Sequence, residues 1–171
     1  LMLTLGSGCR KENFITDASA VLEFSQDSIL FDTVFTTVGS TTQLLKVYNR
    51  NSDRIKISSL RLEGGTVSPY RLNVDGVPGN SFSDLEIAGE DSMFIFVEVT
   101  LDPTNTSLPF VVEDRIQFVT NGNDQEVILT AWGQDAYFHV NQDLTSLEPL
   151  PAGEIWSNDK PHVIYGIAVV D

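Results

Sequence analysis

Hydrophobic and polar residues alternate with a period of two along much of the chain from Val21 onward. The clearest run covers residues 93–101, where every second residue is apolar. Glu98 and Thr100 make the other face of this run polar, while Phe94 and Phe96 cover part of its outer surface. Successive side chains of a strand point to opposite faces, so the run predicts a half-buried β-strand.

Four shorter runs show the same alternation, with apolar residues at every second position and mostly polar residues between them. The apolar positions are Leu45 and Val47; Ile55 and Ile57; Ile116 and Phe118; and Val127, Leu129 and Ala131. These runs predict further half-buried strands. No stretch of three helical turns in the sequence carries an apolar stripe.

Turn-forming residues separate the predicted strands. Asn121-Gly122 supplies the positive φ angles that a tight hairpin turn requires, and residues 49–53 are expected to form another short hairpin connection. Loops are also expected at residues 64–65, 75–80 and 102–105. The pattern predicts an all-β fold, an immunoglobulin-like antiparallel β-sandwich over residues 21–137 with a C-terminal extra strand region.

Several segments follow one another in a recognisable order: residues 35–39 (FTTVG), 47–51 (VYNRN), 87–92 (IAGEDS), the strand ending at 102–103 (DP), and 127–133 (VILTAWG). This order resembles the immunoglobulin-like domains related to the major sperm protein, including those on bacterial envelope proteins. The resemblance covers residues 32–135 and implies the same sandwich. One departure is Ala131, which stands where that family usually has a glycine.

The only cysteine, Cys9, follows a short apolar run and the small residues Gly6, Ser7 and Gly8. This arrangement resembles the end of a lipoprotein signal peptide, although Gly6 stands where that family usually has Leu. The resemblance implies that residues 1–8 are removed, that Cys9 is the lipid attachment site, and that residues 9–20 link the anchor to the sandwich. The alternative is an incidental free thiol.

Residues 138–171 depart from the sandwich pattern and end in an apolar run. The segment from Gly153 to Asp171 resembles the start of a parallel β-helix in envelope lipoproteins of the Bacteroidetes type. We expect the natural protein to continue beyond Asp171. The alternative is that the last strand pairs back on the sandwich, since an unmatched apolar strand is prone to aggregate.

The net charge is −14, from 24 acidic and 10 basic residues. Such a surface repels phosphates, so we expect no nucleic-acid partner. One cysteine and two widely spaced histidines, His139 and His162, give neither a disulfide framework nor a zinc motif, and no cofactor is predicted. Calcium stays an alternative for two oxygen-rich sets, although turn chemistry also explains them: Asp75, Asn80 and Asp84, and Asn121, Asn123 and Asp124.

Catalytic motifs are missing from the sequence, and we predict that the chain is not an enzyme. The adjacent carboxylates Glu113 and Asp114 do not form a joint acid–base pair, because neighbours on a strand point to opposite faces. They are expected to be solvated charges, because Asp and Glu are mostly exposed. Aromatic side chains offer a different chemistry, since they stack on sugar rings. The possible glycan contacts are Trp156, expected to be exposed, with Tyr137 and Tyr165, whereas Trp132 is expected to pack in the core or between domains.

Two functions are consistent with these features. The first is a non-catalytic spacer or protein-interaction module of a lipoprotein anchored to the outer membrane of a cell envelope. The alternative is a carbohydrate-binding or support domain of a surface protein whose β-helix acts on polysaccharides. The expected partners are the membrane, through Cys9, and an envelope protein or a glycan.

Overall fold

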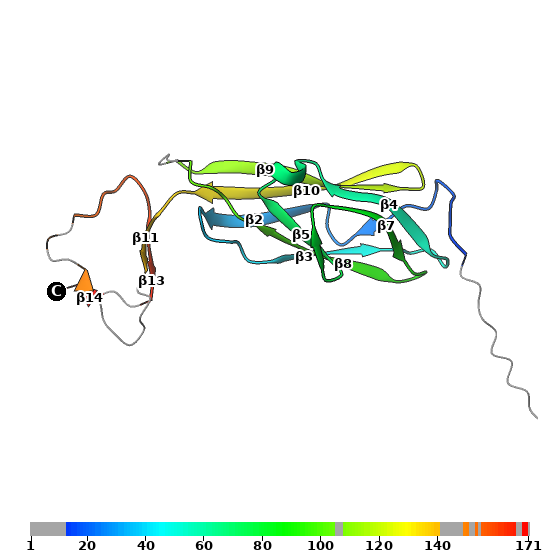
Figure 1. Cartoon of the computed structure of the whole chain (residues 1–171), viewed down its shortest axis with the longest axis horizontal. Helices are drawn as coiled ribbons and strands as arrows, with labels where there is room; N and C mark the ends of the chain where they lie inside the picture. Colours follow the sequence, from blue (N-terminus) through cyan, green and yellow to red (C-terminus); the bar gives the residue numbers. More distant parts are fainter. Residues whose placement is uncertain are drawn as a thin grey trace, which may run out of the picture.

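The computed structural model describes residues 13–104, 108–140, 149–150, 153, 155–166 and 169–170. Within these ranges the one helical element is a single 3₁₀ turn, η1 (Gly65–Val67), and the other regular elements are strands. Ten strands build two facing five-stranded sheets. Four further strands form two small sheets that lie beyond one end of the sandwich (Figure 1).

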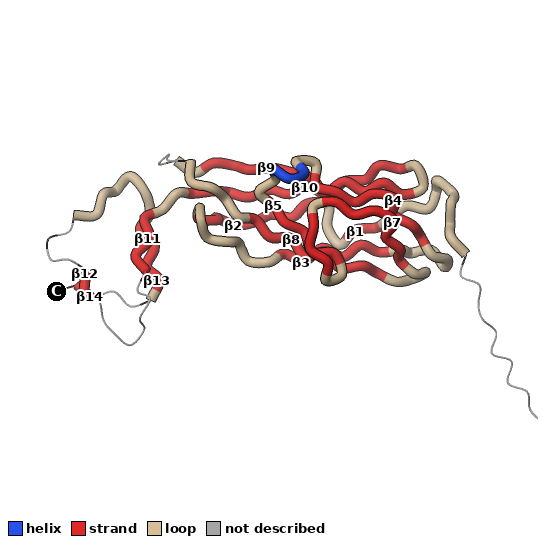
Figure 2. The backbone as a smooth tube through the Cα atoms, in the orientation of Figure 1, coloured by secondary structure: helices blue, strands red, loops and turns tan. Residues whose placement is uncertain are grey.

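The first sheet contains, in spatial order, β1 (Glu23–Phe24), β3 (Gln43–Tyr48), β8 (Ser92–Val99), β5 (Tyr70–Val74) and β6 (Val77–Gly79). The second contains β2 (Ser28–Phe35), β10 (Asn123–Gln134), β9 (Phe110–Thr120), β4 (Ile55–Leu62) and β7 (Ser81–Ile87). Strands fill the body of the molecule, and loops join them at the ends (Figure 2). The prediction of an immunoglobulin-like β-sandwich is confirmed.

The edge of the second sheet departs from a purely antiparallel pattern. β2 runs parallel to β10 through seven residue pairs, from Ser28 opposite Ile128 to Phe35 opposite Gln134. Only three residues separate β2 from β1, which belongs to the other sheet. The first part of the chain therefore contributes to both sheets, and the alternation pattern alone did not predict the direction of the β2–β10 pair.

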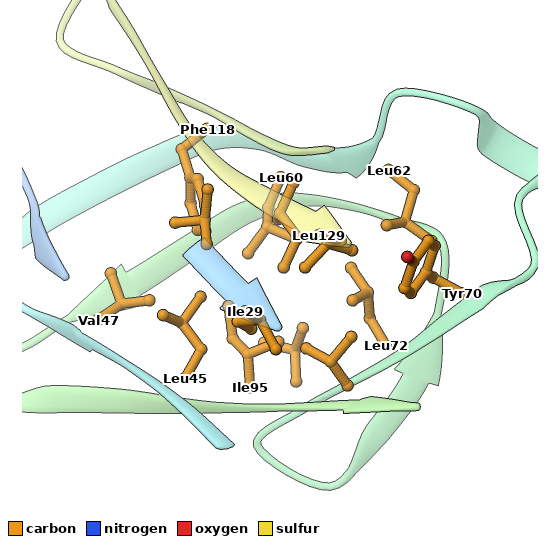
Figure 3. Packing of buried hydrophobic residues seen from close by; sticks show 14 of the residues in the cluster. Ile29, Leu45, Val47, Leu60, Leu62, Tyr70, Leu72, Ile95, Phe118 and Leu129 are labelled. Atoms are coloured by element: carbon orange, nitrogen blue, oxygen red, sulfur yellow. The ribbon is translucent and has the colours of Figure 1, made fainter. Parts of the chain in front are cut away.

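The core lies between the sheets, and the alternation predicted its members. Side chains from the first sheet, including Leu45, Val47 and Ile95, meet Leu60 and Leu129 of the second (Figure 3). The predicted inward residues of the clearest run, at every second position of 93–101, are all buried. The expectation that Trp132 packs in the core is wrong: it points outward from β10 and is 41% exposed, because the residues on either side of it take the inward positions. Packing of Trp132 between domains stays a prediction.

The two predicted hairpin connections have different outcomes. Asn121 and Gly122 form the two-residue turn between β9 and β10, with φ angles of 50° and 80°, as expected. Residues 49–53 do not form a hairpin, because β3 and β4 belong to different sheets. This segment crosses from one sheet to the other instead. Turn residues suit both kinds of connection, and they do not distinguish a hairpin from a crossing.

A buried asparagine holds this crossing together. Asn49 has no exposed surface, and its Nδ2 donates to the carbonyl oxygens of Asp53 (2.8 Å), Ile87 (3.1 Å) and Ala88 (3.0 Å). Its Oδ1 accepts from the backbone and side-chain nitrogens of Asn51. One side chain thus joins the β3–β4 crossing to the β7–β8 connection.

A second buried polar group corrects the expectation of solvated carboxylates. Asp114, on β9, is 8% exposed and accepts hydrogen bonds from the Ser68 hydroxyl and from the Gly64 backbone nitrogen. Its neighbour Glu113 points to the opposite face of the strand, where the side chain lies at the surface. The alternation of the strand therefore predicts the directions of both side chains correctly. The expectation that Asp114 is solvated is wrong, because its side chain points inward.

Tyr70 lies beside this carboxylate and gives a pH-dependent prediction. The ring is fully buried, and its hydroxyl donates to the Val112 carbonyl at 2.8 Å. Burial first, and the charges of Asp114 and Glu113 second, raise the pKa of the phenol.

A raised phenol pKa stabilises the folded protein fully below the ordinary value of about 10 and loses that contribution as the pH rises above it. We expect the free energy of unfolding to fall above pH 10, with a slope from Tyr70 that approaches about 1.4 kcal/mol per pH unit. Urea unfolding at pH 9, 10 and 11 checks this result. Tyr70→Phe is less stable at neutral pH but should show a shallower alkaline decline, and equal slopes in the two proteins would contradict the prediction.

Candidate functional site

Beyond the sandwich, the chain twice returns to lie beside itself in the same direction. β11 (Tyr137–Val140) pairs in parallel with β13 (His162–Tyr165), and β12 (Pro149–Leu150) pairs in parallel with β14 (Val169–Val170). Each of these strands therefore skips its successor in the chain: β11 pairs with β13 and not with β12, and β12 pairs with β14 and not with β13. Two successive passes of the chain are thereby placed side by side.

The β11–β13 pair carries two different faces. Tyr137 lies opposite His162, and His139 lies opposite Ile164, so these four side chains share one face. The other face carries Phe138, Val163 and Tyr165. There the Phe138 and Tyr165 rings stack with centroids 6.3 Å apart.

Two histidines and a tryptophan form a compact group on the first face, here called the His–Trp cluster (His139, Trp156 and His162). His139 Nε2 and His162 Nδ1 are 2.9 Å apart, which is a hydrogen-bond distance. The indole of Trp156 stacks on both imidazoles, with ring centroids 4.3 Å and 4.4 Å away and interplanar angles of 11° and 6°. The cluster joins β11, β13 and the segment that precedes β13.

The backbone determines which histidine donates. His162 Nε2 lies 2.8 Å from the Ser157 carbonyl oxygen, which can only accept, so this nitrogen carries a proton. In the neutral imidazole the remaining nitrogen, Nδ1, then has a free lone pair and accepts. His139 must therefore donate from Nε2 to His162 Nδ1. A single carbonyl oxygen thus sets the tautomers of both rings.

A polar rim surrounds Tyr137 next to the cluster. Its ring lies 5.0 Å from the His162 ring, and its hydroxyl donates to Asp159 at 3.2 Å. A hydrogen bond from Ser157, more than the one from Tyr137, lowers the pKa of the Asp159 carboxyl. Lys160 Nζ is 5.9 Å from the Tyr137 ring centroid. The rim offers one carboxylate and one ammonium beside an aromatic ring.

Short contacts join this region to the sandwich. The Asp135 carboxylate is 4% exposed and lies 3.6 Å from Lys160 Nζ, and it also accepts from the Thr104 backbone nitrogen at 3.2 Å. The Phe138 ring meets Phe35 of β2 edge-on at 6.3 Å. With only two residues between β10 and β11, these contacts restrict how the small sheets can turn relative to the sandwich.

The predicted site residues fall into three groups. Cys9 lies outside the described residues. Tyr137 and Trp156 are brought to the same face, but Trp156 is half-buried under its histidine stack rather than exposed. Tyr165 is 44% exposed on the opposite face. The three aromatics therefore do not form one flat platform.

The histidine pair was missed by sequence reasoning, because 23 residues separate the two rings. A signal was available in the parallel arrangement itself. Once β11 is aligned with β13, Tyr137 faces His162 and His139 is the diagonal neighbour on the same face. Spacing along the chain carries no such information without the alignment.

Two carboxylates of the first oxygen-rich set considered for calcium already have partners within the protein. Asp75 accepts from the Phe94 backbone nitrogen, and Asp84 pairs with Lys56. Among the residues that the structure describes, no three His, Cys, Asp or Glu side chains gather to hold a metal ion. In the same ranges, no helix is long and apolar enough to cross a membrane.

Several solved structures align with this chain at low sequence identity. No family model and no curated protein matches it. The PapD-like domain 7 of human CEP192 aligns at 10% identity with a TM-score of 0.44, over 79% of this chain and 99% of that domain. WR4, a major sperm protein family member of C. elegans, aligns at 12% identity with a TM-score of 0.39, over 67% of this chain and 98% of that protein.

A third solved structure also aligns with part of this chain. A family 123 glycoside hydrolase from Clostridium perfringens aligns at 8% identity with a TM-score of 0.45. The alignment covers 66% of this chain but only 26% of the hydrolase. At such identities and scores the matches carry no argument about ligand or activity, because function resides in sites placed on a fold.

Proposed function

We propose that this chain is a non-catalytic spacer of a lipid-anchored cell-envelope protein, which holds a β-helical region away from the membrane surface. The observation that carries the proposal is the placement of the two chain connections at opposite ends of the sandwich. The described chain starts at one end, and β11 to β14 lie beyond the other (Figure 1). A spacer needs its two attachments far apart.

The first connection is fastened to the sandwich through residues 13–22, here called the leading segment. Ile15 and Asn13 exchange backbone hydrogen bonds with Arg54, at the start of β4. Ala20 and Leu22 are buried. A pull on the leading segment is therefore transmitted to the sandwich near the β9–β10 hairpin, rather than through a free linker.

Polar side chains of that hairpin bind the leading segment. Asn121 and Asn123 donate to the carbonyl oxygens of Ala20 and Ala18, at 3.2 Å and 2.7 Å. Gln125 both donates to the Leu22 carbonyl and accepts from its backbone nitrogen, at 2.9 Å each. These turn residues thus act as a backbone clamp, which supports a fixed attachment at this end.

The second connection supports a β-helix at the other end. In a parallel β-helix, each pass of the chain pairs in parallel with the pass before it. The β11–β13 and β12–β14 pairs have this relation, at offsets of 25 residues (Tyr137 with His162) and 20 residues (Pro149 with Val169). The Asp135–Lys160 ion pair would hold such a coil at a set angle to the sandwich.

Glycan contact through Trp156, Tyr137 and Tyr165 stays a prediction, and the separation of Tyr165 from the other two makes it the second candidate. A cation-π contact with Lys160 and a hydrogen bond to Asp159 already engage Tyr137.

Fatty-acid labelling tests the anchor on which the spacer depends. In cells that make the natural protein, we expect the wild type to carry the label and to sediment with membranes. Cys9→Ala should lose the label completely and leave the membrane fraction, because the thiol is the only attachment point for the lipid. Ser7→Ala is the matched control and should keep both properties. Label in neither wild type nor variant would remove the anchor from the proposal.

A further inference from the structure

The hydrogen bond of the His–Trp cluster depends on the number of protons that its two imidazoles carry. In the neutral pair, His139 donates from Nε2, His162 accepts at Nδ1, and His162 donates from Nε2 to the Ser157 carbonyl. Three of the four ring nitrogens are therefore engaged. Within the described part of the chain, the fourth, His139 Nδ1, has no hydrogen-bond partner and is the position at which a proton adds without breaking a bond.

We propose that His139 and His162 form a two-proton clasp between β11 and β13, in which the first proton tightens the contact and the second opens it. The clasp rests on the geometry of the two rings and not on the function proposed above. It would make the order of the small sheets depend on the proton concentration around the protein.

The first proton adds to His139 Nδ1 and turns that ring into an imidazolium. Its Nε2–H still points at His162 Nδ1, so the hydrogen bond becomes charge-assisted, and such bonds are shorter and stronger than neutral ones. The Trp156 indole stacks on the ring at 4.3 Å and attracts the cation through its π-electrons. The singly protonated pair is therefore the most tightly held state.

The second proton can add only at His162 Nδ1, the atom that accepts the hydrogen bond. Two N–H groups would then face each other across 2.9 Å, and two positive charges would lie in stacked contact with one indole. Like charges at this distance repel strongly. The rings must separate, and β13 is released from β11 at this point.

The charged and titratable neighbours do not cancel this repulsion. The Tyr137 ring lies tilted against His162, and its hydroxyl donates to Asp159. Lys160 adds a positive charge near Tyr137 and pairs with Asp135. Among the described residues, no carboxylate forms an ion pair with either imidazole. Tyr165, the remaining titratable group of β13, lies on the opposite face.

NMR of the full chain tests the clasp directly, because the protein has only two histidines. Ring ¹⁵N shifts report the protonation of each nitrogen between pH 8 and pH 4. We expect the two rings to bind their protons in order, because one ring nitrogen is open and the other accepts the hydrogen bond between the rings. The first should appear at His139 Nδ1. The second should appear at His162 Nδ1 and coincide with loss of amide-exchange protection in β11 and β13 only.

Two variants distinguish a clasp from ordinary packing. Trp132→Phe leaves Trp156 as the only tryptophan, so its fluorescence should fall with the first step, as imidazolium quenches a stacked indole, and should change again when the stack opens. His139→Gln keeps a donor towards His162 but removes the first proton site, so only one step should remain. Two independent single-step titrations, or β11–β13 protection that survives double protonation, would overturn the proposal.

Discussion

Asn49→Ala is expected to lower the free energy of unfolding by about 3 kcal/mol, because it removes a fully buried amide that forms hydrogen bonds with several backbone groups at once. The side chain is fully buried and supplies hydrogen bonds to three carbonyl oxygens, at Asp53, Ile87 and Ala88. Urea denaturation measures the loss as a lower midpoint with an unchanged slope.

Asn123→Ala is the matched control, since it removes an asparagine that makes one exposed hydrogen bond, to the Ala18 carbonyl. Asn123→Ala should lower the free energy of unfolding by only about 0.5–1 kcal/mol. Asn49→Asp keeps the size of the side chain but turns an oxygen towards the three carbonyls, so it should be at least as harmful as alanine. Equal losses of stability for the Asn49→Ala and Asn123→Ala variants would show that the β3–β4 crossing does not depend on the buried amide.

Gly89→Ala, in the β7–β8 connection beside the β3–β4 crossing, should lower the free energy of unfolding by about 3 kcal/mol. This value is in the upper part of the range for overpacking. A Cβ at this position would lie 2.0 Å from the Ser52 carbonyl oxygen and 2.4 Å from its carbon. Both are backbone atoms, so no side chain can rotate away. The Glu90 nitrogen donates to the Asn51 carbonyl at 2.8 Å beside this contact, and separating the two loops would break that bond.

Gly39→Ala provides the comparison, because its Cβ would meet only Thr100 Oγ1 at an ordinary 3.8 Å. We expect a change within about 0.5 kcal/mol for this variant. Thermal unfolding of the wild type and both variants measures the difference. A Gly89→Ala protein as stable as Gly39→Ala would mean that the two loops can move apart freely, which would also weaken the account of Asn49.

The strands were predictable because burial imposes a simple rule on each of them. Residues such as Leu45, Ile95 and Leu129 alternate with outward neighbours, and a period of two survives wherever one face is covered. The Asn121-Gly122 turn was predictable for a local reason, since few residues adopt its φ angles. In both cases the residues that determine the structure lie within a few positions of the structure they determine.

Other features depend on contacts between segments that are far apart in the sequence, so no local sequence pattern predicts these features. The path of residues 49–53 is set by the bonds of Asn49 to Ile87 and Ala88, nearly 40 residues away. The His–Trp cluster depends likewise on the alignment of β11 with β13. The linker-like sequence around Trp156 suggested an exposed aromatic, but the stack on two imidazoles follows only from the way the chain folds back.

The parallel pairing of β2 with β10 has a mechanical consequence. The leading segment reaches the start of β2 from one end of the sandwich, while the chain leaves β10 at the other end. Tension between these two points pulls the strands in opposite directions along their own axes. The load is then shared by all seven residue pairs as shear, instead of opening them one by one as in a peeled hairpin. A larger force is therefore needed to separate β2 from β10 than to open a hairpin of the same length.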